Sequence, residues 1–140
     1  MPDPKTAEIT NWLVKANQDL QAAERLLIGA HPLTDIASFH SQQSAEKAIK
    51  AYLTLHETVF PKTHSLVALI SLCLQISEEF EQLRVAAITL TPYAVASRYP
   101  GDSPNLTIED AQQALALAQS VWQFILARIP AAISELFKAH

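Results

Sequence analysis

Apolar residues recur every three or four positions along most of the chain, which is the spacing of amphipathic helices. From Ala7 to Ile28 the apolar positions advance in steps of four and three residues, and residues 108–129 repeat this rhythm. Shorter seams of the same kind run through 35–57, 65–76 and 77–94. No segment shows the sustained alternation of apolar and polar residues that is typical of a half-buried strand. The pattern therefore predicts an all-α protein, an antiparallel up-and-down bundle of four to five helices on short connections.

Polar residues, prolines and glycines mark where the first three helices begin and end. Thr6 is placed to cap the first helix, and Gly29 followed by Pro32 is placed to end it. The third helix starts after a proline-containing loop, where either His64 or Ser65 can serve as its cap.

The second half of the chain carries similar boundary signals. The fourth segment opens at Ser77, before two glutamates that favour a helix N-terminus, and Pro92 predicts a kink or a restart. The last helix opens with Thr107 as its cap and with Asp110 in place of the usual glutamate of a capping box. Pro130 stops or bends it, which leaves a frayed tail or one more short helix at the C-terminus.

Composition bounds the size of the domain and the kind of partner. The chain has 140 residues, of which 49% are hydrophobic and 17% charged. This balance predicts one folded domain over residues 1–140, with its core at about 7–129. The net charge of −4 argues against binding polyanions over a broad basic face, but it allows a local basic pocket.

Cys73, the only cysteine, lies in an apolar run and is expected to be a small buried hydrophobe rather than a reactive thiol. Cysteine and histidine positions do not have the spacing of a zinc site, and we expect neither a metal nor another cofactor. The N-terminus is polar, and no segment approaches the ~20 apolar residues that span a bilayer. We therefore expect a cytoplasmic protein with no membrane partner.

The stretch ASRYPGDSPNLT, residues 96–107, breaks the helical pattern before the last helix. Its prolines and Gly101 favour a corner in the chain. Arg98 and Tyr99 directly precede the Pro-Gly break, where an arginine can hydrogen-bond the last free carbonyls of the preceding helix. In the alternative interpretation, Arg98 grips a phosphate in a cleft with its planar guanidinium, while Tyr99 stacks or donates a hydrogen bond.

The second predicted helix has an unusually polar middle, FHSQQSAEKAIKAYL. One of its faces holds Phe39, Gln43, Glu46 and Lys50. An overlapping face holds Gln43, Lys47 and Lys50. Periodicity alone favours a solvated face that is stabilised by the Glu46–Lys50 pair at i,i+4. The alternative is a surface that binds a nucleotide or phosphate, with His40 facing the same cleft.

Three motifs follow one another along the chain: SQQSAEKAIKAYL in the second helix, KTHSLVALI after it, and RYPGD before a last helix that opens with TIEDA. Their order and spacing resemble the HEPN domain (higher eukaryotes and prokaryotes nucleotide-binding), in the branch with an RYP motif before the last helix. WLVKANQDLQAAERLL, near the N-terminus, resembles that family's first helix. The resemblance covers about residues 9–129 and implies a bundle of about five helices, often a symmetric dimer.

The resemblance also implies a range of functions. Such domains are frequently encoded beside a minimal nucleotidyltransferase, in arrangements resembling toxin–antitoxin pairs; some bind nucleotides, and some are inactive scaffolds. Members that are metal-independent ribonucleases carry an arginine, a short polar spacer and a histidine near the start of the last long helix. Arg98 matches the place of that arginine, but the next histidine after it is His140. His64, in KTHSL, matches a histidine common in this branch, so Arg98 and His64 are the catalytic candidates.

Two hypotheses of different classes follow from these residues. The favoured one is an interaction module that forms a homodimer, pairs with a nucleotidyltransferase in a toxin–antitoxin-like system, and holds a nucleotide or RNA. Its candidate binding residues are Arg98, Tyr99, Lys47, Lys50, Gln43 and His40. The alternative is a metal-independent endoribonuclease, in which Arg98 supplies a cation and His40 or His64 transfers a proton.

The expected homodimer rests on apolar residues that lie outside the helical seams. Additional apolar surface of this kind often marks an interface between protein chains. The residues in question are Val14, Leu26, Leu55, Leu117 and Val121.

Overall fold

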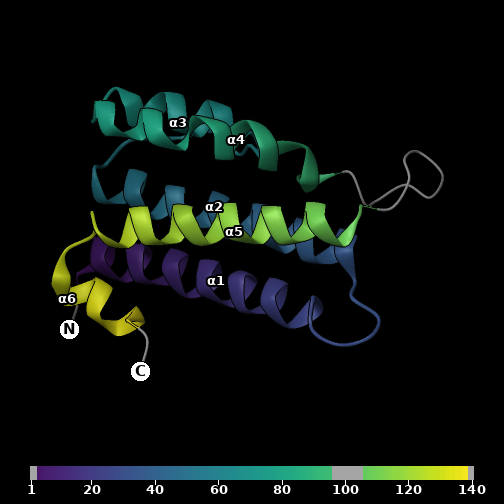
Figure 1. Ribbon diagram of the computed structural model, residues 1–140. Helices are drawn as coiled ribbons and strands as arrows, with labels where there is room; N and C mark the ends of the chain where they lie inside the picture. Colours follow the sequence, from purple (N-terminus) through teal and green to yellow (C-terminus); the bar gives the residue numbers. More distant parts are fainter. Residues whose placement is uncertain (1–2, 96–105, 139–140) are drawn as a thin grey trace.

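The computed structural model describes residues 3–95 and 106–138, and all regular structure in these ranges is helical. The elements are α1 (Pro4–Leu26), α2 (Thr34–Leu55), α3 (Leu66–Leu74), the 3-10 helix η1 (Glu78–Leu83), α4 (Arg84–Leu90), η2 (Thr91–Ala94), α5 (Ile108–Leu126), α6 (Ala131–Ser134) and η3 (Glu135–Phe137). The long helices α1, α2 and α5 run along the bundle, and α3 with α4 forms a layer on the side away from α1 (Figure 1). The predicted all-α bundle is confirmed.

α2 is the central helix of the bundle and packs against α1, α5, α3, α4 and η2. Small residues make up much of its buried surface and of the facing side of α5. They include Ala45, Ala48 and Ala51 of α2 and Ala111, Ala114 and Ala118 of α5, all fully buried. Helix axes approach more closely where the contact residues are small, so α2 is covered on several sides. This coverage explains why polar side chains in the middle of α2 are withdrawn from solvent.

α1 begins earlier than its apolar seam predicts. The side chain of Asp3 accepts a hydrogen bond of 2.7 Å from the backbone N–H of Thr6 and thereby caps the helix. Pro4 lies in the first turn, where backbone N–H groups have no acceptor within the helix, so the lack of an N–H in proline costs no hydrogen bond. The prediction that Thr6 caps this helix was wrong, because the Asp-Pro start signal lies outside the seam. Gly29, with a φ of 98°, follows the helix end as predicted.

α3 and the segments after it form a compact layer on α2 and α5. Ser65 caps α3 by accepting a hydrogen bond of 3.1 Å from the N–H of Ala68, so Ser65 rather than His64 is the cap. The fourth predicted segment is three short helices, so it has one more break than Pro92 predicts, and Ser77 caps the first of them. The predicted restart near Pro92 is confirmed, because η2 begins one residue before it.

The start of α5 has the predicted capping box. The hydroxyl of Thr107 accepts from the N–H of Asp110 at 3.0 Å, and the Asp110 carboxylate accepts from the N–H of Thr107 at 3.2 Å. Pro130 precedes one more short helix, α6. Of the two alternatives for the C-terminus, a frayed tail or a short helix, the second is therefore confirmed. The rings of Trp122 and Phe137 meet edge to face at 5.7 Å, which packs the C-terminal segment back onto α5.

One of the five apolar residues expected at an interface is part of the core instead. Val121 is only 1% exposed, because the apolar face of α5 is wider than a single seam. Val14 is 37% exposed, whereas Leu55 and Leu117 are half-buried and pack against the core.

Cys73 is fully buried in α3, as expected of a small hydrophobe. Burial raises the pKa of its thiol to about 12, so the thiolate is scarce at neutral pH. None of the helices in the described part of the chain is both long enough and apolar enough to cross a membrane.

Candidate functional site

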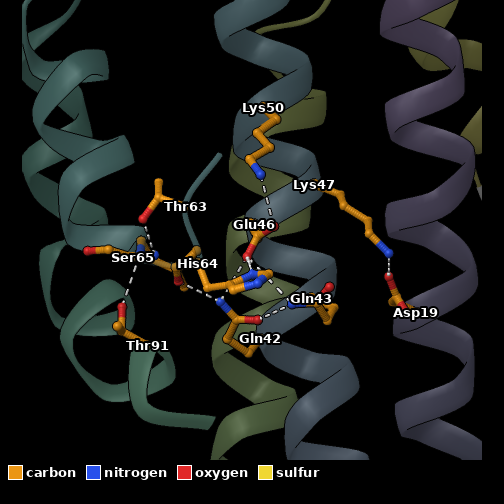
Figure 2. Close-up of polar contacts among 11 residues, drawn as sticks. Asp19, Gln42, Gln43, Glu46, Lys47, Lys50, Thr63, His64, Ser65 and Thr91 are labelled. Carbon is orange, nitrogen blue, oxygen red and sulfur yellow. Dashed lines mark hydrogen bonds and ion pairs between the residues drawn. The ribbon is translucent and has the colours of Figure 1, made fainter. Parts of the chain in front are cut away.

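The carboxylate of Glu46 is the centre of a polar cluster in the middle of α2 (Figure 2). It is 5% exposed and accepts hydrogen bonds from Lys50 Nζ at 3.0 Å and from His64 Nδ1 at 2.9 Å. Gln42 Nε2 lies 3.3 Å from the same carboxylate, and Gln43 Nε2 lies 3.5 Å away. A buried charge requires such partners, so this cluster replaces the water that Glu46 would otherwise bind.

Lys50 is almost completely enclosed by protein. Its side chain is 9% exposed, and Nζ lies 5.6 Å from the ring centroids of both Trp12 and Phe60. These aromatic faces and the carboxylate of Glu46 stabilise the ammonium group together. The expectation of a solvated face was therefore wrong for Glu46 and Lys50, because the loop after α2 and the first turns of α1 cover them.

His64 is the most exposed member of the cluster, with 55% of its side chain open to solvent. Gln42 Nε2 donates to the backbone carbonyl of His64 at 2.9 Å, and Glu46 holds the ring through Nδ1. A carboxylate that binds Nδ1 fixes the ring orientation and leaves Nε2 as the second functional atom. This imidazole can exchange a proton with a ligand or hydrogen-bond a phosphate oxygen.

A second polar cluster joins α1 to α2. Asp19, in α1, accepts from Lys47 Nζ at 2.6 Å and pairs with His40 Nδ1 at 2.8 Å. The Asp19 side chain is 12% exposed, whereas those of Lys47 and His40 are 24% and 29% exposed. Lys47 and His40, two of the predicted binding residues, thus both pair with the carboxylate of Asp19. Gln43, another predicted binding residue, donates to Gln42 Oε1 at 2.6 Å.

Arg98 and Tyr99 lie outside the described residues, together with the corner at Gly101. The described residues on either side of that segment are held by hydrogen bonds. On one side, the hydroxyl of Thr91 accepts from the N–H of Leu66 at 3.1 Å, which ties η2 to the start of α3.

On the other side of that segment, Leu106 is fixed to the start of α2. Its N–H donates to Asp35 Oδ1 at 2.9 Å, and its carbonyl accepts from the hydroxyl of Thr34 at 2.8 Å. Of the described residues on its two sides, Thr91 is therefore bound to the start of α3 and Leu106 to the first turn of α2.

Asp19 and Gln42 belong to these clusters but were not singled out from the sequence. For both residues, the position among apolar residues of the sequence indicated a buried side chain. Asp19 lies three residues after Ala16 and four before Ala23, directly within the apolar seam of α1. Gln42 lies three residues before Ala45, on the buried side of α2. A polar residue at a seam position is expected to be buried with a specific partner.

The family model of the HEPN domain matches residues 9–129. Among solved structures, TT1696 from Thermus thermophilus is 29% identical, with a TM-score of 0.71 over 87% of this chain and 98% of that chain. ST0689, described as an archaeal HEPN homologue, is 24% identical and has a TM-score of 0.69 over 88% of this chain and 98% of that chain, which shows the shared fold. No protein with a curated description matches. The chain belongs to the HEPN domain family.

Proposed function

We propose that this chain is a nucleotide- or RNA-binding interaction module that acts as a homodimer beside a nucleotidyltransferase, in a toxin–antitoxin-like system. Membership of the HEPN family supports an association with nucleotides or RNA. In this proposal Arg98 binds a phosphate through its guanidinium group, and Tyr99 stacks on the ligand or donates a hydrogen bond.

The hydrogen bond between Leu66 and Thr91 is the observation that carries this proposal. It brings η2, from which the chain continues towards Arg98, against the start of α3, where His64 is exposed. Arg98 is the third residue after Val95 in the sequence, and three residues span at most about 11 Å. A phosphate held by Arg98 would then have the exposed ring of His64 within the same part of the surface.

We assign Lys47, Lys50 and His40 to supporting roles in this site. Their polar groups are bound to Asp19 and Glu46, so they fix the shape and charge of α2 and leave Arg98 as the proposed ligand cation. Removing one of them would then act on ligand binding through the position of the neighbouring helices.

Replacing Arg98 with alanine should weaken binding of a fluorescein-labelled single-stranded RNA about tenfold, equivalent to ~1.4 kcal/mol. The reason is the loss of a two-pronged contact between guanidinium and phosphate. Arg98→Lys should lose much of the same affinity, because an ammonium group cannot form that fork. Fluorescence anisotropy measures the affinities, and the melting temperature should stay close to that of the wild type.

Arg25→Ala is a matched control for this experiment, because Arg25 is an exposed arginine in the last turn of α1. It removes the same charge and should change RNA affinity much less than Arg98→Ala. If the wild type binds no RNA and Arg98→Ala lowers the melting temperature, Arg98 acts as a helix-capping residue and the proposal fails.

The proposed partners can be tested with the complete chain. Multi-angle light scattering should give the mass of two chains, and a protein that is monomeric over a wide concentration range would remove the homodimer. Co-expression with the nucleotidyltransferase encoded nearest to this gene should yield one complex on size-exclusion chromatography. Separate elution of the two proteins at micromolar concentration would remove the pairing.

The Glu46–His64 pair favours a second candidate function, a metal-independent endoribonuclease. A buried carboxylate that orients an exposed imidazole is an arrangement suited to general acid–base catalysis. Arg98 would then stabilise the charge on the phosphorane. The sequence after Arg98 lacks the histidine of the family's ribonucleases, and His64 would have to act from a different element.

We expect the isolated protein to show no strong ribonuclease activity. A metal-free site loses a factor of about 10²–10⁴ unless an acid or base lies within hydrogen-bond reach of the reacting phosphate, and Arg98 cannot take that role because an arginine stays protonated near neutral pH. His64 is oriented by Glu46, but it belongs to a different element from the histidine of the family's ribonucleases. The measurement is cleavage of mixed RNA by purified protein in EDTA, repeated with His64→Ala and Arg98→Ala. Robust cleavage that both substitutions abolish would establish the endoribonuclease instead.

A further inference from the structure

A groove of about 940 Å³ lies between α1, α5 and the C-terminal segment, away from the clusters on α2. Its size falls in the range of small-molecule sites, which is about 300–1,000 Å³. Four side-chain amides line it, from Asn17 and Gln21 of α1 and from Gln119 and Gln123 of α5. Neither the phosphate site proposed above nor the Glu46 cluster includes any of these residues.

The amides of this groove are mostly uncommitted. Within residues 3–95 and 106–138, the side chains of Asn17, Gln21 and Gln123 form no hydrogen bond with another residue. Gln119 has one long contact, 3.5 Å from Nε2 to the carboxylate of Glu24. Each primary amide offers two donor hydrogens and an acceptor oxygen, so the lining can match a ligand edge of mixed donors and acceptors.

Apolar and aromatic side chains complete the lining. Phe137, which is half-buried, packs edge to face on the buried Trp122 and forms one wall. Leu136, which is 65% exposed, contributes aliphatic surface, whereas Leu20 and Leu126 are buried. Flat apolar ligand faces pack favourably on such surface. Lys138 and Glu24 give the lining one cationic and one anionic group, so a ligand with a neutral hydrogen-bonding edge fits it better than a polyanion.

We propose that this groove binds an unpaired nucleobase and reads its edge through the amides of α1 and α5. The inference rests on the proposed association with RNA and adds a second site to it. A glutamine or asparagine amide forms paired hydrogen bonds with a base edge, as it does with adenine. Glu24 accepts hydrogen bonds from the ribose hydroxyls, and the half-buried ring of Phe137 contacts the face of the base.

The test uses the four ribonucleosides adenosine, guanosine, cytidine and uridine, because they carry no phosphate. Each is titrated into the ¹⁵N-labelled full chain, and the side-chain amide and tryptophan indole signals are followed by NMR. At least one nucleoside should saturate these signals. The double variant Gln21→Ala/Gln123→Ala should weaken that binding at least tenfold, because two base contacts are lost.

Gln18→Ala/Gln112→Ala is the matched control, since both glutamines lie on the same two helices and neither lines the groove. It should leave nucleoside binding unchanged. No saturation by any nucleoside up to millimolar concentration, or equal losses in both double variants, would overturn the inference. A groove variant that changes the oligomeric mass instead would assign this surface to a second copy of the chain, which also overturns it.

The outcomes separate this inference from the proposed function. RNA binding that depends on Arg98, combined with no nucleoside binding, removes the groove and leaves the module intact. Nucleoside binding that depends on Gln21 and Gln123, without any binding of RNA, supports the groove and removes the RNA-binding module.

Discussion

Replacing Glu46 with alanine is expected to lower the free energy of unfolding by about 3–5 kcal/mol. The substitution leaves the ammonium group of Lys50 buried between two aromatic rings without its carboxylate partner. It also removes the acceptor for His64 and for the amide of Gln42. Breaking a buried pair from one side costs more than the pair contributes, because the remaining charge keeps its desolvation penalty.

Urea denaturation followed by circular dichroism measures this change. Glu81→Ala is the matched control, because Glu81 also forms an ion pair, with Arg84, but on the exposed surface. Exposed pairs of this kind contribute little, so the control should unfold close to the wild-type midpoint. The double variant Glu46→Gln/Lys50→Met should regain part of the lost stability, since it removes both charges. A Glu46→Ala protein with wild-type stability would contradict the central role of this carboxylate.

Phe80→Ala should have a similarly large effect, about 3–5 kcal/mol of unfolding free energy. Phe80 is completely buried, and its ring centroid lies 4.5 Å from that of Tyr52 in α2 and 5.0 Å from that of Phe124 in α5. Phe80 therefore anchors η1 to α2 and α5, together with the buried side chain of Leu83 and the ion pair between Glu79 and Arg128. Truncation leaves a cavity where three aromatic rings meet, which the short helices around it cannot fill.

Thermal and urea unfolding measure the loss, and Ile88→Ala is the control, because Ile88 is 58% exposed on the neighbouring helix α4. Hydrogen exchange adds a local readout: in Phe80→Ala the amides of α3 and α4 should exchange faster than those of α1. Equal stability of the two variants would show that η1 is not anchored by this ring.

The helices were predictable because a helix that buries one face has apolar residues at every third or fourth position. The capping box at Thr107 was predictable as well, because its two partners are close neighbours in the sequence. At α3 the sequence left His64 and Ser65 as alternative caps, and at α1 it favoured Thr6 over the true cap, Asp3. Boundaries set by tertiary contacts were harder. The fourth segment has a continuous seam, yet it folds as three short helices with Phe80 anchoring the first.

The candidate site was predictable in its residues but not in its pairings. Periodicity places Glu46 and Lys50 on one face, but it does not show that Trp12 and Phe60 cover that face. His64 and Glu46 are eighteen residues apart, and their contact depends on how the loop between α2 and α3 folds back. The environment of a charged residue is a property of the packed structure, so one sequence cannot determine it.

The C-terminal segment that packs against Trp122 has a practical consequence for every binding assay proposed above. The two chain ends lie at the same end of the bundle (Figure 1), and Lys138 itself lines the amide groove. An affinity tag at the C-terminus would follow closely on Lys138 in the sequence and could compete with a nucleoside for the groove. Removing a cleavable tag before the assay avoids this interference. Immobilising the protein through its N-terminus leaves the opposite end of the bundle, where η2 ends and α5 begins, free to contact RNA.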